Sequence, residues 1–167
     1  MSSGIYLRHP EIDDQREFLA LVRNSRALHH PWTSAPSTPA QFREYVDRMA
    51  LPANRGLLVC RRDSEGIVGV INISNIVHGL FRSGYLGYYA FAGHERQGLM
   101  REGLQAAVRY AFNSLKLHRL EANIQPGNAA SIALVKSCGF TMEGYSPRYL
   151  KIGGRWRDHQ RWAILAN

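Results

Sequence analysis

The sequence predicts an α+β fold, with a mixed, twisted sheet of about seven strands flanked by about four helices. Three observations indicate this class. Short segments that alternate apolar and polar residues are numerous, which is typical of strands. Four other segments repeat apolar residues at helical spacing. The resulting order, β-α-α-β-β-β-α-β-α-β-β, places a strand–helix–strand unit at the centre of the sheet.

The first half should contain one strand, two helices and a three-stranded meander. Residues 5–8 alternate and form the short first strand. Residues 11–30 space their apolar side chains helically, and Pro31 ends that helix. A second helix begins with a capping pattern in which Thr38 is the cap and Pro39 the first helical residue. The remaining predicted ranges are 37–50 for this helix and 56–62, 67–77 and 85–92 for the strands.

The second half alternates helices with strands. Residues 98–115 carry an apolar stripe at helical spacing. Residues 118–126 alternate and form a half-buried strand. A short helix follows, with Asn128 as its cap and Gly139 just past its end. Residues 141–166 close the chain as a hairpin with two central glycines.

Length and composition indicate one ordinary globular domain over residues 1–167, with 45% hydrophobic and 20% charged residues. The N-terminal residues turn polar at once, unlike a signal peptide, and no run of about 18 apolar residues could cross a membrane. We therefore expect a cytoplasmic protein without a membrane partner. Cys60 and Cys138 are then expected to be reduced packing residues.

The formal net charge of +8 favours polyanionic partners such as ribosomal RNA, tRNA or a phosphorylated cofactor. The basic residues are scattered, however, and no RNA-binding signature accompanies them. Association with the ribosome and a merely solvated basic surface therefore both stay open.

The stretch HERQGLMREGL, residues 94–104, places glycines where a helix begins, although glycine is a poor helix former. A helix N-terminus binds anions through its unpaired N–H groups and positive dipole. Without a Cβ at Gly98, a phosphate can approach closely, and Gly103 would admit a neighbouring backbone. Alternatively, Gly98 shapes the loop and Gly103 packs on the sheet. The predicted phosphate contacts are the amides of Gln97, Gly98, Leu99 and Met100 and the side chains of Arg96 and Arg101.

A second polar-capped helix favours the same conclusion. Asn128 and Ser131 lie one turn apart at its start and point the same way. In a strand–helix–strand–helix order, both helices start at the C-terminal edge of the sheet, where α/β folds bind ligands.

Four segments carry a family resemblance: SNIVHGLFRSGYLGYYAFA, QGLMREGLQAAVRYAF, HRLEANIQPGNAASIALVKSCGF and EGYSPRYLKIGGRWRDHQRWAI. In this order and spacing the chain resembles the GNAT N-acetyltransferases, and among them the RimJ/RimL-type ribosomal-protein-alanine N-acetyltransferases, closer to RimJ. The resemblance implies the GNAT fold and acetyl-CoA as co-substrate, without a metal. The cofactor would lie in a cleft where strand 85–92 splays from strand 120–125.

The resemblance also implies roles for residues in that cleft. Backbone groups of Tyr88 and Ala90 would pair with the pantetheine arm, and an N–H there would face the oxyanion. Asn128 would bond to the arm, and Ser131 would protonate the leaving sulfur, unless it only supports the helix cap. Three residues depart from the family pattern: Glu95 and Met100 in the diphosphate motif, and Val135 in place of a general-acid tyrosine.

The general base is left open. Asn123 is predicted to hold a water that relays a proton, whereas Glu121 is either a base or a surface partner of Arg119. Trp32 either stacks over a peptide substrate or covers the core. Tyr85 either faces the acceptor or only packs in its strand. The motif WRDH, residues 156–159, is interpreted as structural.

The predicted function is acetyl transfer from acetyl-CoA to a primary amine, most simply the N-terminal α-amino group of a ribosomal protein. A small amine, such as a polyamine, antibiotic or amino acid, is an alternative acceptor. A module that binds coenzyme A or RNA without turnover is the third possibility. We expect a monomer or a homodimer.

Overall fold

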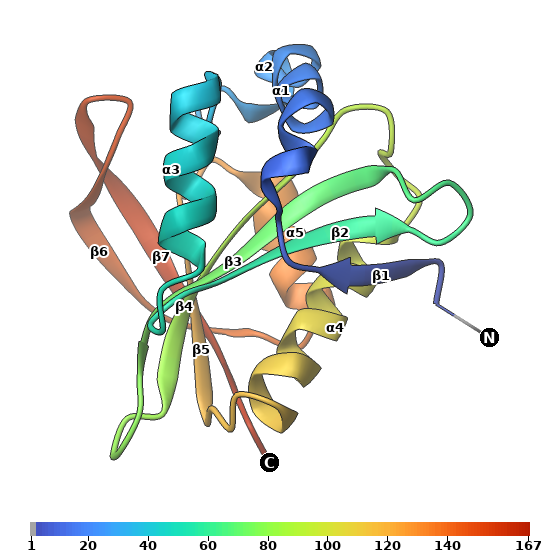
Figure 1. Cartoon of the computed structure of the whole chain (residues 1–167). Helices are drawn as coiled ribbons and strands as arrows, with labels where there is room; N and C mark the ends of the chain where they lie inside the picture. Colours follow the sequence, from blue (N-terminus) through green and yellow to red (C-terminus); the bar gives the residue numbers. More distant parts are fainter. Residues whose placement is uncertain (1–2) are drawn as a thin grey trace.

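The computed structural model describes residues 3–167, which form one seven-stranded sheet in the order β1-β2-β3-β4-β5-β7-β6 (Figure 1). The α+β class, the seven strands and the mixed sheet are confirmed. The strands are β1 (Ile5–Arg8), β2 (Arg55–Arg61), β3 (Ile67–Val77), β4 (Ser83–Ala90), β5 (Arg119–Ile124), β6 (Thr141–Ile152) and β7 (Arg155–Leu165). The helices are α1 (Gln15–Asn24), α2 (Arg26–His29), α3 (Pro39–Met49), α4 (Leu99–Asn113) and α5 (Ala129–Ser137), with a 3-10 turn at Ile12–Asp14.

The predicted helix over 11–30 is not continuous. It is divided into the 3-10 turn, α1 and the four-residue α2, so the described chain has five α-helices where four were expected. The break falls at Ser25, whose φ of −111° is not helical. Ser25 is buried, and its hydroxyl accepts a hydrogen bond from the Ala92 N–H at 2.9 Å. A contact with a residue so distant in sequence has no local signature.

The two faces of the sheet have separate cores. Aromatic side chains of α1 and α3 pack on one face, where Phe18, Phe42 and Tyr45 are fully or almost fully buried. Apolar residues of α4 and α5 pack on the other face, with Leu104 and Val135 fully buried. Because both faces are covered, the inner strand β2 reads as a nearly continuous apolar run.

The caps and the glycines position α4 and α5 largely as predicted. The Thr38 and Asn128 side chains accept N–H groups at the starts of α3 and α5. A Cβ at Gly103 would lie 2.9 Å from both Cγ methyls of Val59 on β2. The close neighbour is thus a side chain and not a backbone, so the prediction that Gly103 packs on the sheet is confirmed.

The two central strands separate as the resemblance implied. β4 and β5 pair in parallel over Ser83–Leu86 and Arg119–Ala122. Within the described chain, residues 87–90 of β4 have no partner on β5, while β5 continues to pair with β7 up to Ile124. The sheet therefore opens at the carboxyl ends of two parallel strands, and α4 and α5 both begin near this edge (Figure 1).

Two further findings concern the chain as a whole. No helix among residues 3–167 combines the length and the apolar character needed to cross a membrane. Cys60 and Cys138 are free thiols, buried and half-buried respectively, and burial raises the pKa of each.

Candidate active site

A cavity of about 540 Å³ occupies the gap between β4 and β5. Its walls come from both strands, the loop before α4, the start of α5, the segment around α2, and the β6–β7 hairpin. The cavity thus reaches from the mouth of α4 through the split sheet to the opposite face. Its residues include most of those that the sequence singled out: Trp32, Tyr88, Ala90, Arg96, Gly98, Leu99, Met100, Asn123, Asn128 and Ser131.

The mouth of α4 offers free amides. Gly98 is the N-cap, with a left-handed φ of +72° and no side chain to cap the helix. The first intrahelical bond of this turn runs from the Glu102 N–H to the Gly98 carbonyl. The amides of Leu99, Met100 and Arg101 therefore precede the helical ladder. A Cβ on Gly98 would meet no atom within 4 Å, so the space in front of these amides is open.

The side chains around this mouth differ in where they point. Arg96 is exposed and lines the cavity. Gln97 instead accepts a 2.8 Å hydrogen bond from Arg61 on β2, and neither Gln97 nor Arg101 lines the cavity. The Met100 side chain packs on Gly69 of β3, where a Cβ would lie 2.5 Å from its sulfur. Cofactor contacts by Gln97 and Arg101 stay predictions.

Tyr88 and Ser131 meet within the cavity. The Tyr88 hydroxyl lies 2.7 Å from the Ser131 Oγ and 3.3 Å from the Ser131 carbonyl oxygen. Burial raises the pKa of Tyr88 to about 12, so its phenol is protonated at neutral pH. Asn128 caps α5 by accepting the Ser131 N–H at 3.3 Å, which leaves the Ser131 hydroxyl free of a capping role. The sequence indicated Ser131 but gave no signal for the Tyr88 hydroxyl.

The free edge of β4 carries the predicted backbone contacts. The Phe91 N–H donates to the Val68 carbonyl on β3 at 2.8 Å. Since successive amides of a strand point in opposite directions, the N–H groups of Ala90 and Tyr88 point away from β3 and into the gap. The Ala90 carbonyl accepts a 2.8 Å hydrogen bond from Nε2 of His29. Ala90 therefore retains its N–H for a ligand.

The opposite face forms a second compartment. Trp32 packs against the turn before α5, where a Cβ on Gly127 would lie 3.1 Å from the Trp32 ring. Three buried polar atoms in the cavity walls lack partners in the described chain: Tyr89 Oη, His94 Nδ1 and Asn123 Oδ1. Buried polar atoms are normally satisfied, so each of these atoms indicates that a ligand or water binds next to it.

The profile of the acetyltransferase (GNAT) domain matches residues 5–141. The chain belongs to this family. It is 45% identical over 102 residues to the ribosomal protein uS5-alanine N-acetyltransferase of Escherichia coli (strain K12), which covers 61% of this chain and 53% of that protein.

Two solved GNAT structures share the fold. RimJ of Mycobacterium smegmatis in complex with CoA-disulfide superimposes with a TM-score of 0.90 and 24% identity, covering 97% of this chain and 82% of that one. A spermidine N-acetyltransferase from Vibrio cholerae in complex with CoA and spermine gives a TM-score of 0.80 and 25% identity, covering 98% and 96%. The resemblance to RimJ-type GNAT enzymes is confirmed.

The departures from the GNAT pattern have structural explanations. Glu95 accepts a 2.9 Å hydrogen bond from the Gly93 N–H, and backbone N–H groups of Glu95 itself and Gly93 hold the pKa of this carboxyl below its ordinary value. The carboxylate thus braces the loop before α4. Val135, at the usual place of the general-acid tyrosine, is fully buried in the core. A different tyrosine hydroxyl, that of Tyr88 on β4, lies in the cavity beside Ser131.

Several predicted residues lie outside this GNAT cavity. Tyr85 does not line it and is 38% exposed. Glu121 pairs with Arg119 at 2.7 Å, and Arg119 also binds Glu143, so the interpretation of Glu121 as a surface partner is confirmed. In the WRDH motif, Asp158 accepts the Tyr145 hydroxyl at 2.7 Å and the Arg148 N–H at 2.8 Å, a structural role.

His159, from the same WRDH motif, was missed as a site residue. It is buried and lines the cavity. The alternation of residues in the last strand assigns His159 to one face of the sheet. The sequence did not show that this face lines the cleft. Among residues 3–167, no group of three or more His, Cys, Asp or Glu side chains has the arrangement of a metal site.

Proposed function

We propose that this GNAT enzyme transfers the acetyl group of acetyl-CoA to the N-terminal α-amino group of a protein, with a ribosomal protein as its substrate. The observation that carries the proposal is the split between β4 and β5, with free amides at one end and the Tyr88–Ser131 pair inside it. The similarity to the uS5-alanine N-acetyltransferase supports this acceptor class.

The residues of the cleft fit acetyl-CoA. The amides of Leu99 and Met100 and the cation of Arg96 would hold the diphosphate, because a helix start favours phosphate. Backbone groups of Tyr88 and Ala90 would continue the sheet toward the pantetheine arm, and the Asn128 amide group is free to donate to it. Acetyl-CoA supplies the acetyl thioester.

Three groups of the chain then serve the transfer. The Ala90 N–H points into the gap and would donate to the thioester oxygen as negative charge grows there. The Tyr88–Ser131 pair is a protonated donor for the leaving sulfur. Asn123 lines the cavity, and its buried, unpartnered Oδ1 would accept a hydrogen bond from a water held beside it.

The acceptor compartment favours a protein N-terminus over a polyamine. Among the described residues that line the cavity, the one carboxylate is Glu95, in the loop before α4. A polyamine carries several positive charges that need acidic partners when they are buried. Apolar side chains of Leu28, Trp32, Leu150 and Ile152 instead suit a small first residue whose chain leaves the cleft.

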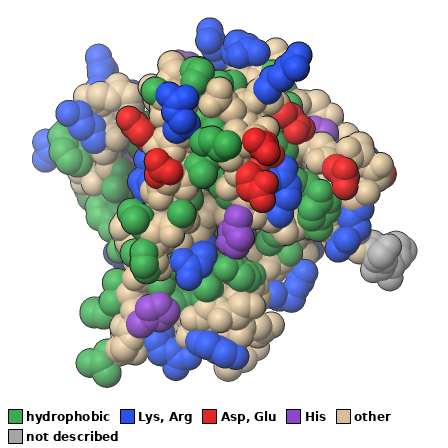
Figure 2. Space-filling view, viewed as in Figure 1, with side chains coloured by type: hydrophobic (Ala, Val, Ile, Leu, Met, Phe, Trp, Pro, Cys, Tyr) green, Lys and Arg blue, Asp and Glu red, His purple; other side chains and the backbone are tan. Residues whose placement is uncertain are grey.

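The basic surface supports work near ribosomal RNA only in a general way. Figure 2 shows Lys and Arg side chains spread over one face and interrupted by acidic ones, rather than gathered in one patch. The net charge of +8 would raise the rate of encounter with an anionic ribosome through long-range attraction. Ribosome association and a cytoplasmic location therefore belong to the proposal.

The test is acetylation by the purified enzyme. Peptides with the first residues of ribosomal proteins, spermidine, and an amino acid are each incubated with labelled acetyl-CoA. We expect the N-terminal peptides to be acetylated and the polyamine to be poor. Faster acetylation of spermidine would move the acceptor to the small-amine class.

Matched variants separate an enzyme from a binding module. Ser131→Ala should lower kcat, whereas Ser137→Ala, on the exposed side of the same helix, should not. Gly98→Glu should abolish coenzyme A binding and turnover together. Coenzyme A binding without acetylation of any amine would make the protein a binder.

A further inference from the structure

We infer that His159 is the general base of acetyl transfer, and that its Nε2 takes a proton from the acceptor ammonium directly or through one water. The inference rests on the proposed function. An α-amino group has a pKa of about 8, so most of it is protonated at neutral pH and cannot attack a carbonyl. Glu121, the carboxylate considered from the sequence, is paired with Arg119 outside the cavity.

The backbone fixes the tautomer of His159. Its Nδ1 lies 2.8 Å from the carbonyl oxygen of Arg157. A carbonyl oxygen can only accept a hydrogen bond, so in the neutral ring Nδ1 carries the proton and Nε2 carries the lone pair. Nε2 makes no hydrogen bond within residues 3–167, yet it is not among the buried polar atoms shut off from solvent there. Since His159 lines the cavity, Nε2 is the ring nitrogen left for a ligand there.

The register of the sheet places His159 beside Asn123. Asn123 of β5 lies opposite Arg161 of β7, and His159 is two residues from Arg161 on the same face. Diagonal neighbours of this kind are roughly 7–8 Å apart at Cα, close enough for both side chains to reach one bound amine or water. His159 and Asn123 thus lie on neighbouring strands, on the same face of the sheet, and both line the cavity.

The other candidates are engaged or misplaced. Nε2 of His29 donates to the Ala90 carbonyl, and the His29 ring packs 5.1 Å from Tyr89 and 5.9 Å from Phe91. His94 and Glu95 belong to the loop before α4, at the diphosphate end. The remaining ionisable groups of the cavity are Arg96, which is always charged, and Tyr88 and Tyr89, whose pKa values burial raises.

The reaction balances with this assignment. One ammonium proton moves to Nε2 of His159 and leaves to solvent. The lone pair of the neutral amine forms a C–N bond to the acetyl carbon. The C–S bond breaks, and the electron pair of that bond goes to sulfur. A second nitrogen proton ends on that sulfur through the Tyr88–Ser131 pair. Ammonium and thioester thus give amide, thiol and one proton.

The test uses variants that separate the two ring nitrogens. In His159→Asn, the side-chain amide can still donate to the Arg157 carbonyl from the place of Nδ1, but the base is gone. His78→Gln, in the exposed β3–β4 loop, is the control. At pH 7, we expect kcat for an N-terminal peptide to fall about 10²- to 10⁴-fold in His159→Asn. The Kd for coenzyme A should stay within about twofold of wild type, and His78→Gln should match wild type in both.

A second acceptor isolates the proton transfer. A peptide with an aminooxyacetyl N-terminus presents a nitrogen that is already unprotonated at neutral pH. His159→Asn should acetylate it nearly as fast as wild type, whereas a merely structural defect would slow both acceptors equally. Equal slowing, or kcat above about a tenth of wild type with the ordinary peptide, would overturn the assignment.

One measurement needs no variant. Nitrogen NMR of the histidines in the wild-type protein should show that the neutral ring of His159 carries its proton on Nδ1. A neutral ring with its proton on Nε2 would contradict the inference. A wild-type enzyme that acetylates no amine would remove the proposed function together with this role. An active wild type with an equally active His159→Asn would remove only the role of His159.

Discussion

Replacing Gly98 by alanine should separate the strain of its backbone from its contact with the cofactor. Gly98 has a φ of +72°, and an added Cβ would meet no protein atom within 4 Å. The left-handed conformation costs a residue with a side chain roughly 1–2 kcal/mol. Since no clash adds to this cost, the free energy of unfolding should fall by about that amount.

Cofactor binding should lose more than this strain explains. The Cβ would stand in the open space before the amides of Leu99 and Met100, where the diphosphate is proposed to bind. The loss of one hydrogen bond to a charged group costs about 1.5–3 kcal/mol, which corresponds to a Kd for coenzyme A about 10- to 150-fold higher. Titration calorimetry measures the Kd, and urea denaturation measures the stability.

The β3–β4 loop supplies a matched control. Gly79 has a φ of +76°, and a Cβ added there would also meet no atom within 4 Å, but Gly79 does not line the cavity. Gly79→Ala should therefore cost the same stability and leave the Kd unchanged. If Gly98→Ala bound coenzyme A like wild type, or if both variants weakened binding alike, the α4 mouth would not be the diphosphate site.

Three further outcomes follow from other contacts. Gly103→Ala should lower the free energy of unfolding by about 1 kcal/mol, because overpacking against Val59 outweighs the gain in helix propensity. The same change should be stabilising in a Val59→Ala background. Urea denaturation of the wild type, the two single variants and the double variant measures both effects. Glu95→Gln removes a negative charge beside the proposed diphosphate site and should tighten coenzyme A binding up to about fivefold, less at high salt, in calorimetry. Burial alone would raise the pKa of Asp14, but hydrogen bonds from Arg8 and a backbone N–H hold it below its ordinary value. A lowered pKa stabilises the fold above about pH 4 and the benefit is lost as pH falls, so Asp14→Asn should cost about 1–3 kcal/mol at pH 7 and progressively less below pH 4, as followed by thermal unfolding.

The elements that the sequence predicted well are those set by local chemistry. Thr38 and Asn128 cap helices because their oxygens each reach the N–H group three residues on, and the predicted alternation of β5 is seen in its burial. The split between β4 and β5 came from the family resemblance rather than from any property of single residues. The strand propensities of Gly87 and Asn123 do not predict that β4 and β5 separate at these residues.

What the sequence missed depends on contacts between distant segments. Ser25 ends a helix because it binds an amide 67 residues away. The Tyr88 hydroxyl meets Ser131 because α5 brings the two oxygens to within 2.7 Å. His159 became a site residue because β7 inserts between β5 and β6 and turns that face toward the cleft. Periodicity predicts on which face of a strand a residue lies. Which elements that face contacts depends on the order of the strands in the sheet.

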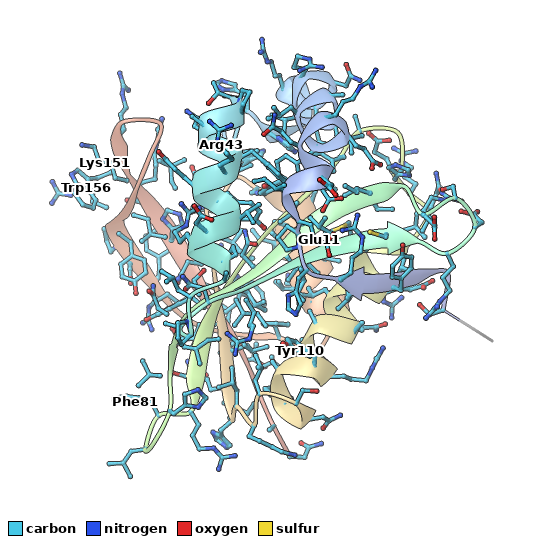
Figure 3. The ribbon with its side chains drawn as sticks, viewed as in Figure 1. Glu11, Arg43, Phe81, Tyr110, Lys151 and Trp156 are labelled. Atoms are coloured by element: carbon cyan, nitrogen blue, oxygen red, sulfur yellow. The ribbon has the colours of Figure 1, made fainter. Side chains whose placement is uncertain are left out.

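The tip of the β6–β7 hairpin bears on how a long acceptor could be received. Figure 3 shows Lys151 and Trp156 projecting outward there, and Trp156 is 61% exposed. Leu150 and Ile152 of the same hairpin line the cavity. A polypeptide whose first residue lay against Leu150 and Ile152 would run close to this tip, so an exchange of the tip should alter preference for later residues of the acceptor.

The hydrogen bonds of Ser25 and His29 to Ala92 and Ala90 tie the segment around α2 to the end of β4. These bonds fix the position of the cavity wall around α2 relative to β4, the strand that would present the thioester. Substitutions in this segment that keep both hydrogen bonds can therefore change which amine fits. The distance between the amine and the thioester would stay the same.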